Sequence, residues 1–289
     1  MKVGSAELES ALELELTGRP IASLGAPDAL VEANRWWMEP HFLESGDTWS
    51  LNFRSWILKA DDSVIVVDPC NGNARPHPMP IFDMLDTPFL ERFEATGTRV
   101  EDVDMVFCTH LHHDHCGWNT MLRDGRWVPT FPNARYLFVQ RELERWHPDN
   151  AGRFRPVPYN DDVYERSIAP VVASGQADLV AEGGRLSPSL SVEPGPGHTA
   201  GHSMLQLQSG GEEAMFTGDA FHHPLQLIDP AIVFGDHDDL AGVIATRRKL
   251  AAASLARDML LIPAHLPYPH AGRMRESVNS GLWFEAVSQ

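Results

Sequence analysis

The chain has 289 residues, 43% of them hydrophobic, which one large α/β domain can accommodate around a sizeable core. Its net charge of −17 repels phosphate backbones and argues against a nucleic-acid partner. No apolar run approaches the roughly 20 residues of a membrane helix, and the acidic N-terminus has no signal-peptide pattern. We therefore expect a cytoplasmic protein without membrane contact. The three cysteines form no C-x-x-C pair, which argues against a disulfide framework and cysteine zinc fingers.

The first half of the chain predicts two strands, a helix and a third strand, behind an N-terminal extension at about 1–50. "RSWILKADDSVIVVDP" predicts two strands joined by a turn at Asp61-Asp62, the second strand being Val64 to Val67. "DTPFLERFEATG" predicts a helix that Thr87 caps and Gly97 ends. Its core-facing stripe comprises Phe89, Leu90 and Phe93. "DMVFCTH" returns as a strand that ends near His110.

The second half predicts further strands and a long helix. "ARYLFVQ" is a strand followed by a short helical stretch through Trp146. Residues 147–185 lose periodicity, and we interpret them as an insertion around a helix near Asp162–Ala173 that could form a lid. "LSVEPGPGHTAGHSMLQLQSGGEEAMFTGD" predicts strand, loop, strand, turn and strand, and "DHDDLAGVIATRRKLAAASLA" a helix. "DMLLIPAH" predicts the last buried strand. The order of the predicted strands and helices indicates a layered α/β fold in a single domain over 1–289.

Metal-ligand residues lie at or just beyond the ends of four predicted elements. "CTHLHHDHCGW" places His110 and His112 where they can face one metal, and Asp114 and His115 where they can face a second. The later stretches "GPGHTAGH", "FTGDAF" and "PAH" add three more ligands. His198 would complete the first site, His265 would complete the second, and Asp219 can bridge the two. Such a set suits two divalent ions, most readily Zn²⁺, although Fe, Mn or Co could use it.

These motifs resemble those of the metallo-β-lactamase-fold hydrolases: H-x-H-x-D-H at His110–His115, then "GHTAGH", "TGD" and "PAH". The resemblance covers about residues 50–270 and implies a four-layer αββα sandwich with a one- or two-metal site at one edge of the sheets. It implies the same division of the seven ligands and a supporting role for Asp68 in "VVDPCNGN". Cys70 stands there in place of the family's glycine.

The chemistry implied is hydrolysis by a metal-bridging hydroxide, with Asp114 or Asp219 moving protons between water and the leaving group. Short strings such as "GDAFHHPLQL" look most like the group of quorum-quenching lactonases and methyl-parathion-type hydrolases. We therefore predict cleavage of a small ester or lactone. The alternatives are a phosphotriester or other xenobiotic hydrolase, including hydrolytic dehalogenation, and less favoured are a thioesterase or an iron-dependent oxidoreductase. A metal-binding protein without enzymatic activity also stays open.

Residues next to the ligands are candidates for the pocket of a neutral or aromatic substrate. Aromatic side chains that could line the pocket are Trp118, Phe221 and Tyr268, and those that could donate a hydrogen bond to the substrate are His222 and His223. Ordinary packing is an equally good interpretation of each aromatic residue. His202 is expected to orient a ligand, and His113 to point away from the metals. The apolar N-terminal residues Leu8, Leu12, Trp36 and Trp37 could form a homodimer contact or pack in the core.

Overall fold

Two β-sheets form the centre of the protein, whose computed structural model describes residues 1–288. The first sheet has seven strands in the order β1 (Lys2–Val3), β2 (Ala6–Pro20), β3 (Thr48–Ala60), β4 (Ser63–Val67), β5 (Met105–Phe107), β8 (Arg135–Val139) and β9 (Ala177–Val180). The second has six in the order β10 (Leu190–Pro194), β11 (Ser203–Ser209), β12 (Glu212–Gly218), β13 (Leu260–Pro263), β14 (Gly272–Ser277) and β15 (Gly281–Ala286). A separate hairpin comprises β6 (Thr120–Arg123) and β7 (Arg126–Pro129).

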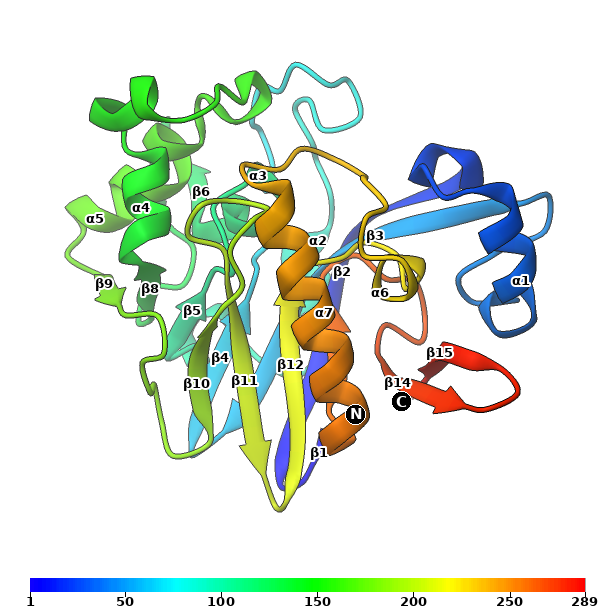
Figure 1. Cartoon of the computed structure of the whole chain (residues 1–289). Helices are drawn as coiled ribbons and strands as arrows, with labels where there is room; N and C mark the ends of the chain where they lie inside the picture. Colours follow the sequence, from blue (N-terminus) through cyan, green and yellow to red (C-terminus); the bar gives the residue numbers. More distant parts are fainter. Residues whose placement is uncertain (289) are drawn as a thin grey trace.

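Helices cover the outer faces of both sheets (Figure 1). The α-helices are α1 (Asp28–Met38), α2 (Phe89–Glu94), α3 (His113–Cys116), α4 (Gln140–Trp146), α5 (Ala169–Ala173), α6 (Leu225–Ile228) and α7 (Leu240–Arg257). A π-helical turn, η6 (Tyr164–Ile168), precedes α5, and short 3₁₀ turns comprise η1 (Ile21–Leu24), η2 (Val100–Asp102), η3 (Gly117–Asn119), η4 (Pro148–Arg153) and η5 (Pro158–Asn160). None of the helices in residues 1–288 combines the length and apolarity that crossing a bilayer would require.

Alternation along the strands separates the hydrophobic layers. In β4, Ile65 and Val67 belong to the cluster between the two sheets, whereas Val66 faces a second cluster with Phe89 and Phe93 of α2. A third cluster lies where α7 and α1 pack on the outer face of the second sheet. The layers therefore follow the order helix, sheet, sheet, helix, which confirms the αββα sandwich expected from the sequence.

Most predicted elements are confirmed, with corrections in detail. β3 and β4 form the expected hairpin, and both turn residues, Asp61 and Asp62, have positive φ. α2 lies where a helix was predicted, but Thr87 does not cap it, because its hydroxyl donates to Asn73 Oδ1 (3.2 Å) instead. β13 is not the last strand, since β14 and β15 follow it and close the second sheet.

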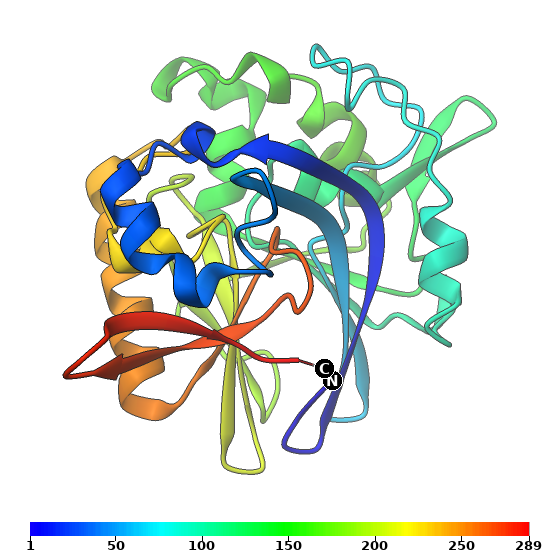
Figure 2. The same ribbon diagram turned by 90° about the vertical axis from the view of Figure 1, so that its right-hand side faces the viewer.

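The two segments that the sequence set apart contribute strands to the first sheet. Within residues 1–50, β2 pairs with β3 along nearly its whole length, and Figure 2 shows the two strands curving together beside α1. Leu8 and Trp37 are buried in the core, whereas Trp36 is 58% exposed and its ring lies 5.9 Å from that of Trp283. Within residues 147–185, η6 and α5 occupy the predicted helix, and β9 adds an edge strand beside β8.

Candidate metal centre

The expected ligands lie together at one edge of the sheets because neighbouring strands end there. β4 and β5 are parallel, so Asp68 and His110, which follow them, leave the sheet side by side. β12 and β13 are also parallel, and they bring Asp219 next to His265. His198 reaches the same place from the loop between β10 and β11. The topology thus gathers candidate ligands separated by up to 155 positions, from His110 to His265.

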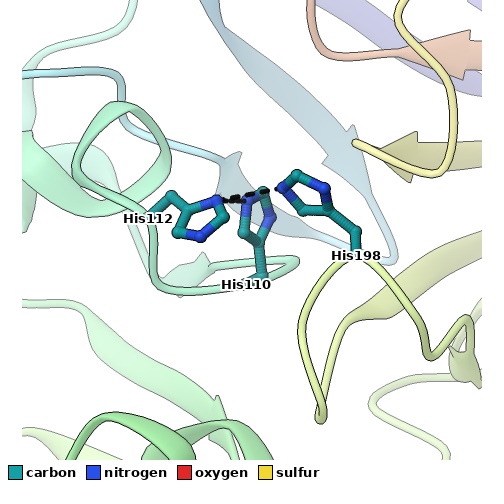
Figure 3. Close-up of side chains that lie close together, drawn as sticks. All are labelled: His110, His112 and His198. Atoms are coloured by element: carbon teal, nitrogen blue, oxygen red, sulfur yellow. Dashed lines mark hydrogen bonds between the residues drawn. The ribbon is translucent and has the colours of Figure 1, made fainter. Parts of the chain in front are cut away.

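Three imidazole rings form the first group of ligands (Figure 3). His112 Nδ1 lies 3.0 Å from both His110 Nε2 and His198 Nε2, and all three side chains are buried. Burial is the main reason why the pKa of His112 falls to about 3 and those of His110 and His198 fall well below the usual value. The rings are therefore neutral at neutral pH and can offer nitrogen lone pairs to a cation.

A second group lies beside the first. His265 Nε2 is 3.3 Å from His115 Nε2. Asp114 Oδ2 lies 3.5 Å from His265 Nε2 and 3.6 Å from His115 Nε2. Although burial raises the pKa of Asp114, the adjacent histidines lower it to about 2, so this carboxyl group is ionised. The second group combines a carboxylate with two imidazoles, whereas the first has imidazoles alone.

Asp219 lies between the two groups and faces each with a different oxygen. Its Oδ1 is 3.0 Å from His265 Nε2 and 3.3 Å from His115 Nε2. Its Oδ2 is 3.4 Å from His198 Nε2 and 3.1 Å from His222 Nε2. One carboxylate therefore faces both sets of ligands.

The donor set fits two divalent cations. Buried Asp219 Oδ1 accepts no hydrogen bond even though two imidazole nitrogens face it. A buried oxygen without a partner costs free energy, as do imidazole nitrogens that face one another, and cations between them would satisfy both. Imidazole and carboxylate are the ligands that zinc and similar ions prefer. Four ligand triads lie within reach of single ions: His110, His112 and His198; His110, His115 and Asp219; Asp114, His115 and His265; and Asp219, His222 and His265.

Asp68 lies beside the centre, where the family resemblance places it. Its carboxylate accepts hydrogen bonds from Thr109 N (2.7 Å) and Thr109 Oγ1 (2.8 Å), and Oδ2 lies 3.1 Å from His115 Nδ1. Cys70, which stands where the family has glycine, adopts φ 35°, in the left-handed region that glycine favours. Its carbonyl accepts a hydrogen bond from Gly117 N (2.7 Å). The turn thus keeps the unusual backbone conformation without the glycine.

His202 also has the expected place behind a ligand. Its Nδ1 donates to Gly195 O (2.9 Å), and its Nε2 accepts from Asp219 N (3.1 Å). Gly218, with φ 48°, permits this approach, because a Cβ there would lie 2.7 Å from His202 Nε2 and 2.5 Å from Thr109 Oγ1. The ring therefore fixes the backbone from which Asp219 projects.

Glu142 of α4 is a buried anchor that the sequence did not reveal. Oε1 accepts from Leu111 N (2.9 Å) and Trp146 Nε1 (2.7 Å), and Oε2 accepts from Thr199 Oγ1 (2.7 Å) and Gly201 N (3.0 Å). Leu111 lies between two ligands of the first group, and Thr199 follows the third. One carboxylate therefore ties together the two loops that bring the first group's imidazoles to one point.

Glu13 of β2 has a similar place on the other side of the ligand loop. Its carboxylate accepts from Asn71 N (2.7 Å), Asn71 Nδ2 (2.8 Å), Gly72 N (3.0 Å) and Trp118 Nε1 (2.6 Å). Both glutamates read as ordinary charged residues in the sequence, since only the folded chain brings their donors together.

Most of the predicted pocket residues do not line the pocket. Trp118 is buried, stacks on Phe89 and points toward Glu13. Phe221 is fully buried in the core, and His223 donates to Phe42 O (2.9 Å). Tyr268 is 53% exposed and lies outside the cavity beside the metal ligands. Of the five predicted pocket residues, only His222 lines that cavity.

The cavity itself has a volume of about 310 Å³ and one largely apolar wall. Its apolar lining comprises Leu16, Leu51, Phe53, Met79, Ile81, Phe82 and Phe234. Five of the seven predicted ligands contribute to its polar lining: His112, Asp114, His198, Asp219 and His265. The rest of the polar lining comprises Arg19, His113, Tyr159, His222 and Asp236. Most of the wall thus comes from β2, β3 and the loop at 79–82, far in sequence from the motifs.

Two histidines without an expected role lie close to the centre. His237 Nδ1 is 3.2 Å from His198 Nδ1, on the side of that ring opposite the other ligands. The ring of His77 lies 4.2 Å from that of His113. Their isolated positions in the sequence gave no signal for either contact.

A His113→Ala variant is expected to keep both metal equivalents. His113 Nδ1 lies 3.0 Å from Asn71 Oδ1, and its ring belongs to neither group of ligands. Elemental analysis of the purified variant checks the expectation, with His115→Ala as the control that should lose metal. If His113→Ala also loses one equivalent, its role has been confused with that of a neighbour.

Solved structures with a similar fold include several hydrolases. The hydrolase AbOPH of the beta lactamase superfamily aligns with a TM-score of 0.78 and 22% identity over 100% of this chain and 97% of that chain. AidC, a dizinc quorum-quenching lactonase in complex with a product, aligns with a TM-score of 0.76 and 18% identity over the same shares. An N-acyl homoserine lactone hydrolase with a product bound at its catalytic metal centre aligns at 0.60 and 16% identity, over 94% of this chain and 100% of that one.

A search of curated proteins gave no match. The profile of the metallo-beta-lactamase superfamily, however, matches residues 54–265, which contain both groups of ligands. This stretch covers well over half of the chain, and the layers of the fold and the order of its motifs agree with the match. The chain therefore belongs to the metallo-beta-lactamase superfamily.

Proposed function

We propose that the protein is a dinuclear metal hydrolase, with zinc as the most suitable metal, that cleaves a small ester or lactone. The observation that carries the proposal is Asp219, whose two oxygens face two ligand groups at the end of a partly apolar cavity. The resemblance in fold to two lactone hydrolases solved with products supports the choice of substrate class.

The seven predicted ligands divide between the two ions as the geometry groups them. His110, His112 and His198 would hold one ion, and Asp114, His115 and His265 the other. Asp219 would be shared. When bound, the pair of ions supplies an activated water near neutral pH and polarises the scissile carbonyl group.

The chain's own residues then bind, orient and move protons. Asp114 and Asp219 are placed to hold a proton at a carboxylate oxygen and pass it to the leaving oxygen. His222 lines the cavity, and its Nε2, 3.1 Å from Asp219 Oδ2, is placed to orient that carboxylate. Phe53 and Phe82 exclude water from one side of the cavity and bind the apolar part of the substrate.

Metal analysis combined with a substrate panel tests this proposal. The purified protein should contain about two metal equivalents and should hydrolyse an acyl lactone or an aryl ester faster than an aryl phosphotriester. Preference for the phosphotriester would favour the xenobiotic-hydrolase alternative. Bound iron with a visible absorption band would favour an oxidoreductase, and full metal content without any turnover would contradict hydrolysis altogether.

A further inference from the structure

Arg19 lies at the end of β2 and lines the same cavity as the metal ligands. It pairs with Trp49 across the sheet, and its guanidinium carbon lies 5.7 Å from the centre of the Trp49 ring and 5.6 Å from that of Phe234. Both aromatic rings therefore lie within cation–π distance of the guanidinium group.

Within residues 1–288, Arg19 has neither an ion-pair partner nor a hydrogen-bond acceptor, and its Nε is buried. Other arginines near the site do have acceptors. Arg155 pairs with Asp236 of the cavity wall (2.6 Å), Arg145 pairs with Asp238 (2.7 Å), and buried Arg247 donates to three backbone carbonyls. The chain has 40 acidic residues, yet the one arginine that lines this cavity has no carboxylate partner.

We propose that Arg19 is a specificity-determining residue that binds an oxygen acceptor on the substrate, away from the bond that is cut. The inference rests on the proposed function and narrows its substrate class to esters or lactones that carry a second carbonyl or a carboxylate. Guanidinium donors that are already oriented lose little entropy on binding, and a charge-assisted hydrogen bond in a partly apolar cavity is among the stronger polar contacts.

Arg19→Met tests the inference, because methionine keeps an unbranched apolar side chain near the two rings but removes the donors and the charge. Two pairs of substrates are compared: an α-acylamino-γ-lactone with the unsubstituted γ-lactone, and an aryl ester of a dicarboxylic acid with that of the monocarboxylic acid of equal length. The first pair tests a neutral carbonyl acceptor and the second a carboxylate.

We expect KM for at least one acceptor-bearing substrate to rise about 10- to 100-fold, the effect of a charge-assisted hydrogen bond. The kcat for that substrate should change less than twofold, and so should kcat and KM for the matched substrate without the acceptor. Arg19→Lys should restore part of the affinity. Arg248→Met on the exposed face of α7 is the matched control for the loss of one positive charge, and it should leave every constant unchanged.

Equal effects of Arg19→Met on both members of each pair, or no effect, would overturn the inference. Its failure is distinguishable from failure of the proposed function, because calorimetric binding of an α-acylamino-γ-lactam and of the unsubstituted γ-lactam needs no turnover. If the wild-type protein hydrolyses none of the substrates, a weaker affinity of Arg19→Met for the acylamino lactam alone would still support Arg19. Equal affinities of the two proteins for the acylamino lactam and for a lactam that carries a carboxylate would refute it. The midpoint of thermal unfolding verifies that each variant is folded.

Discussion

An Asp219→Ala variant is expected to lose at least one equivalent of bound metal and most of its hydrolytic activity, by at least about 100-fold. Replacing residues that only support a metal ligand typically costs 10- to 100-fold, so removing a shared ligand should cost more. The carboxylate lies within 3.4 Å of one imidazole from the first group and of two from the second. Without it, no anionic oxygen lies between the two groups. Elemental analysis and rates on the preferred ester or lactone measure both effects.

The control for this variant is a carboxylate of similar burial that does not face both groups. Glu13 accepts hydrogen bonds from Asn71, Gly72 and Trp118 and, unlike Glu142, contacts neither of the loops that carry His112 and His198. We therefore expect Glu13→Gln to alter stability while both metals stay bound. Full metal content in Asp219→Ala would contradict the shared-ligand assignment. Retained activity with one metal missing would instead show that a single ion is sufficient for hydrolysis.

The sequence predicted that the seven candidate ligands lie together, because strand ends and ligand spacing are local features. His110 follows a short buried strand, and parallel pairing is enough to place it beside its partners once the layers are known. The place of Asp68 beside the centre was implied instead by the resemblance of "VVDPCNGN" to the family's turn, and Asp68 does contact Thr109, next to His110. His202 was expected behind a ligand, and it contacts the backbone of Asp219.

The pocket could not be predicted in that way, because closeness in sequence to a ligand does not determine the direction of a side chain. Trp118 follows the ligand loop but turns away toward α2, and Phe221 follows Asp219 but enters the core. The actual apolar wall includes Leu16 and Phe82, whose positions depend on the curvature of β2 and on a long loop. Such contacts form only in the tertiary structure, so no local sequence pattern predicts them.

A Glu142→Gln variant is expected to lower the free energy of unfolding by about 2–4 kcal/mol and to weaken metal binding about 10- to 100-fold. Both oxygens of Glu142 accept two donors each, so an amide in place of either oxygen directs its own hydrogens at two donors. Gly201 offers no space for a compensating shift, because even a Cβ there would lie 2.2 Å from Glu142 N. Urea unfolding and competition with a chromogenic chelator measure the two effects.

Glu144→Gln, on the exposed side of the same helix, provides the matched control and should alter neither quantity measurably. If Glu142→Gln lowers stability but leaves metal affinity unchanged, Glu142 has a structural role only. Loss of both is expected if the carboxylate holds the loops of His112 and His198 at the separation that one ion requires. In that case, the visible spectrum of the cobalt-loaded variant should differ from that of the wild type, because the geometry of the first group has changed and not only its occupancy.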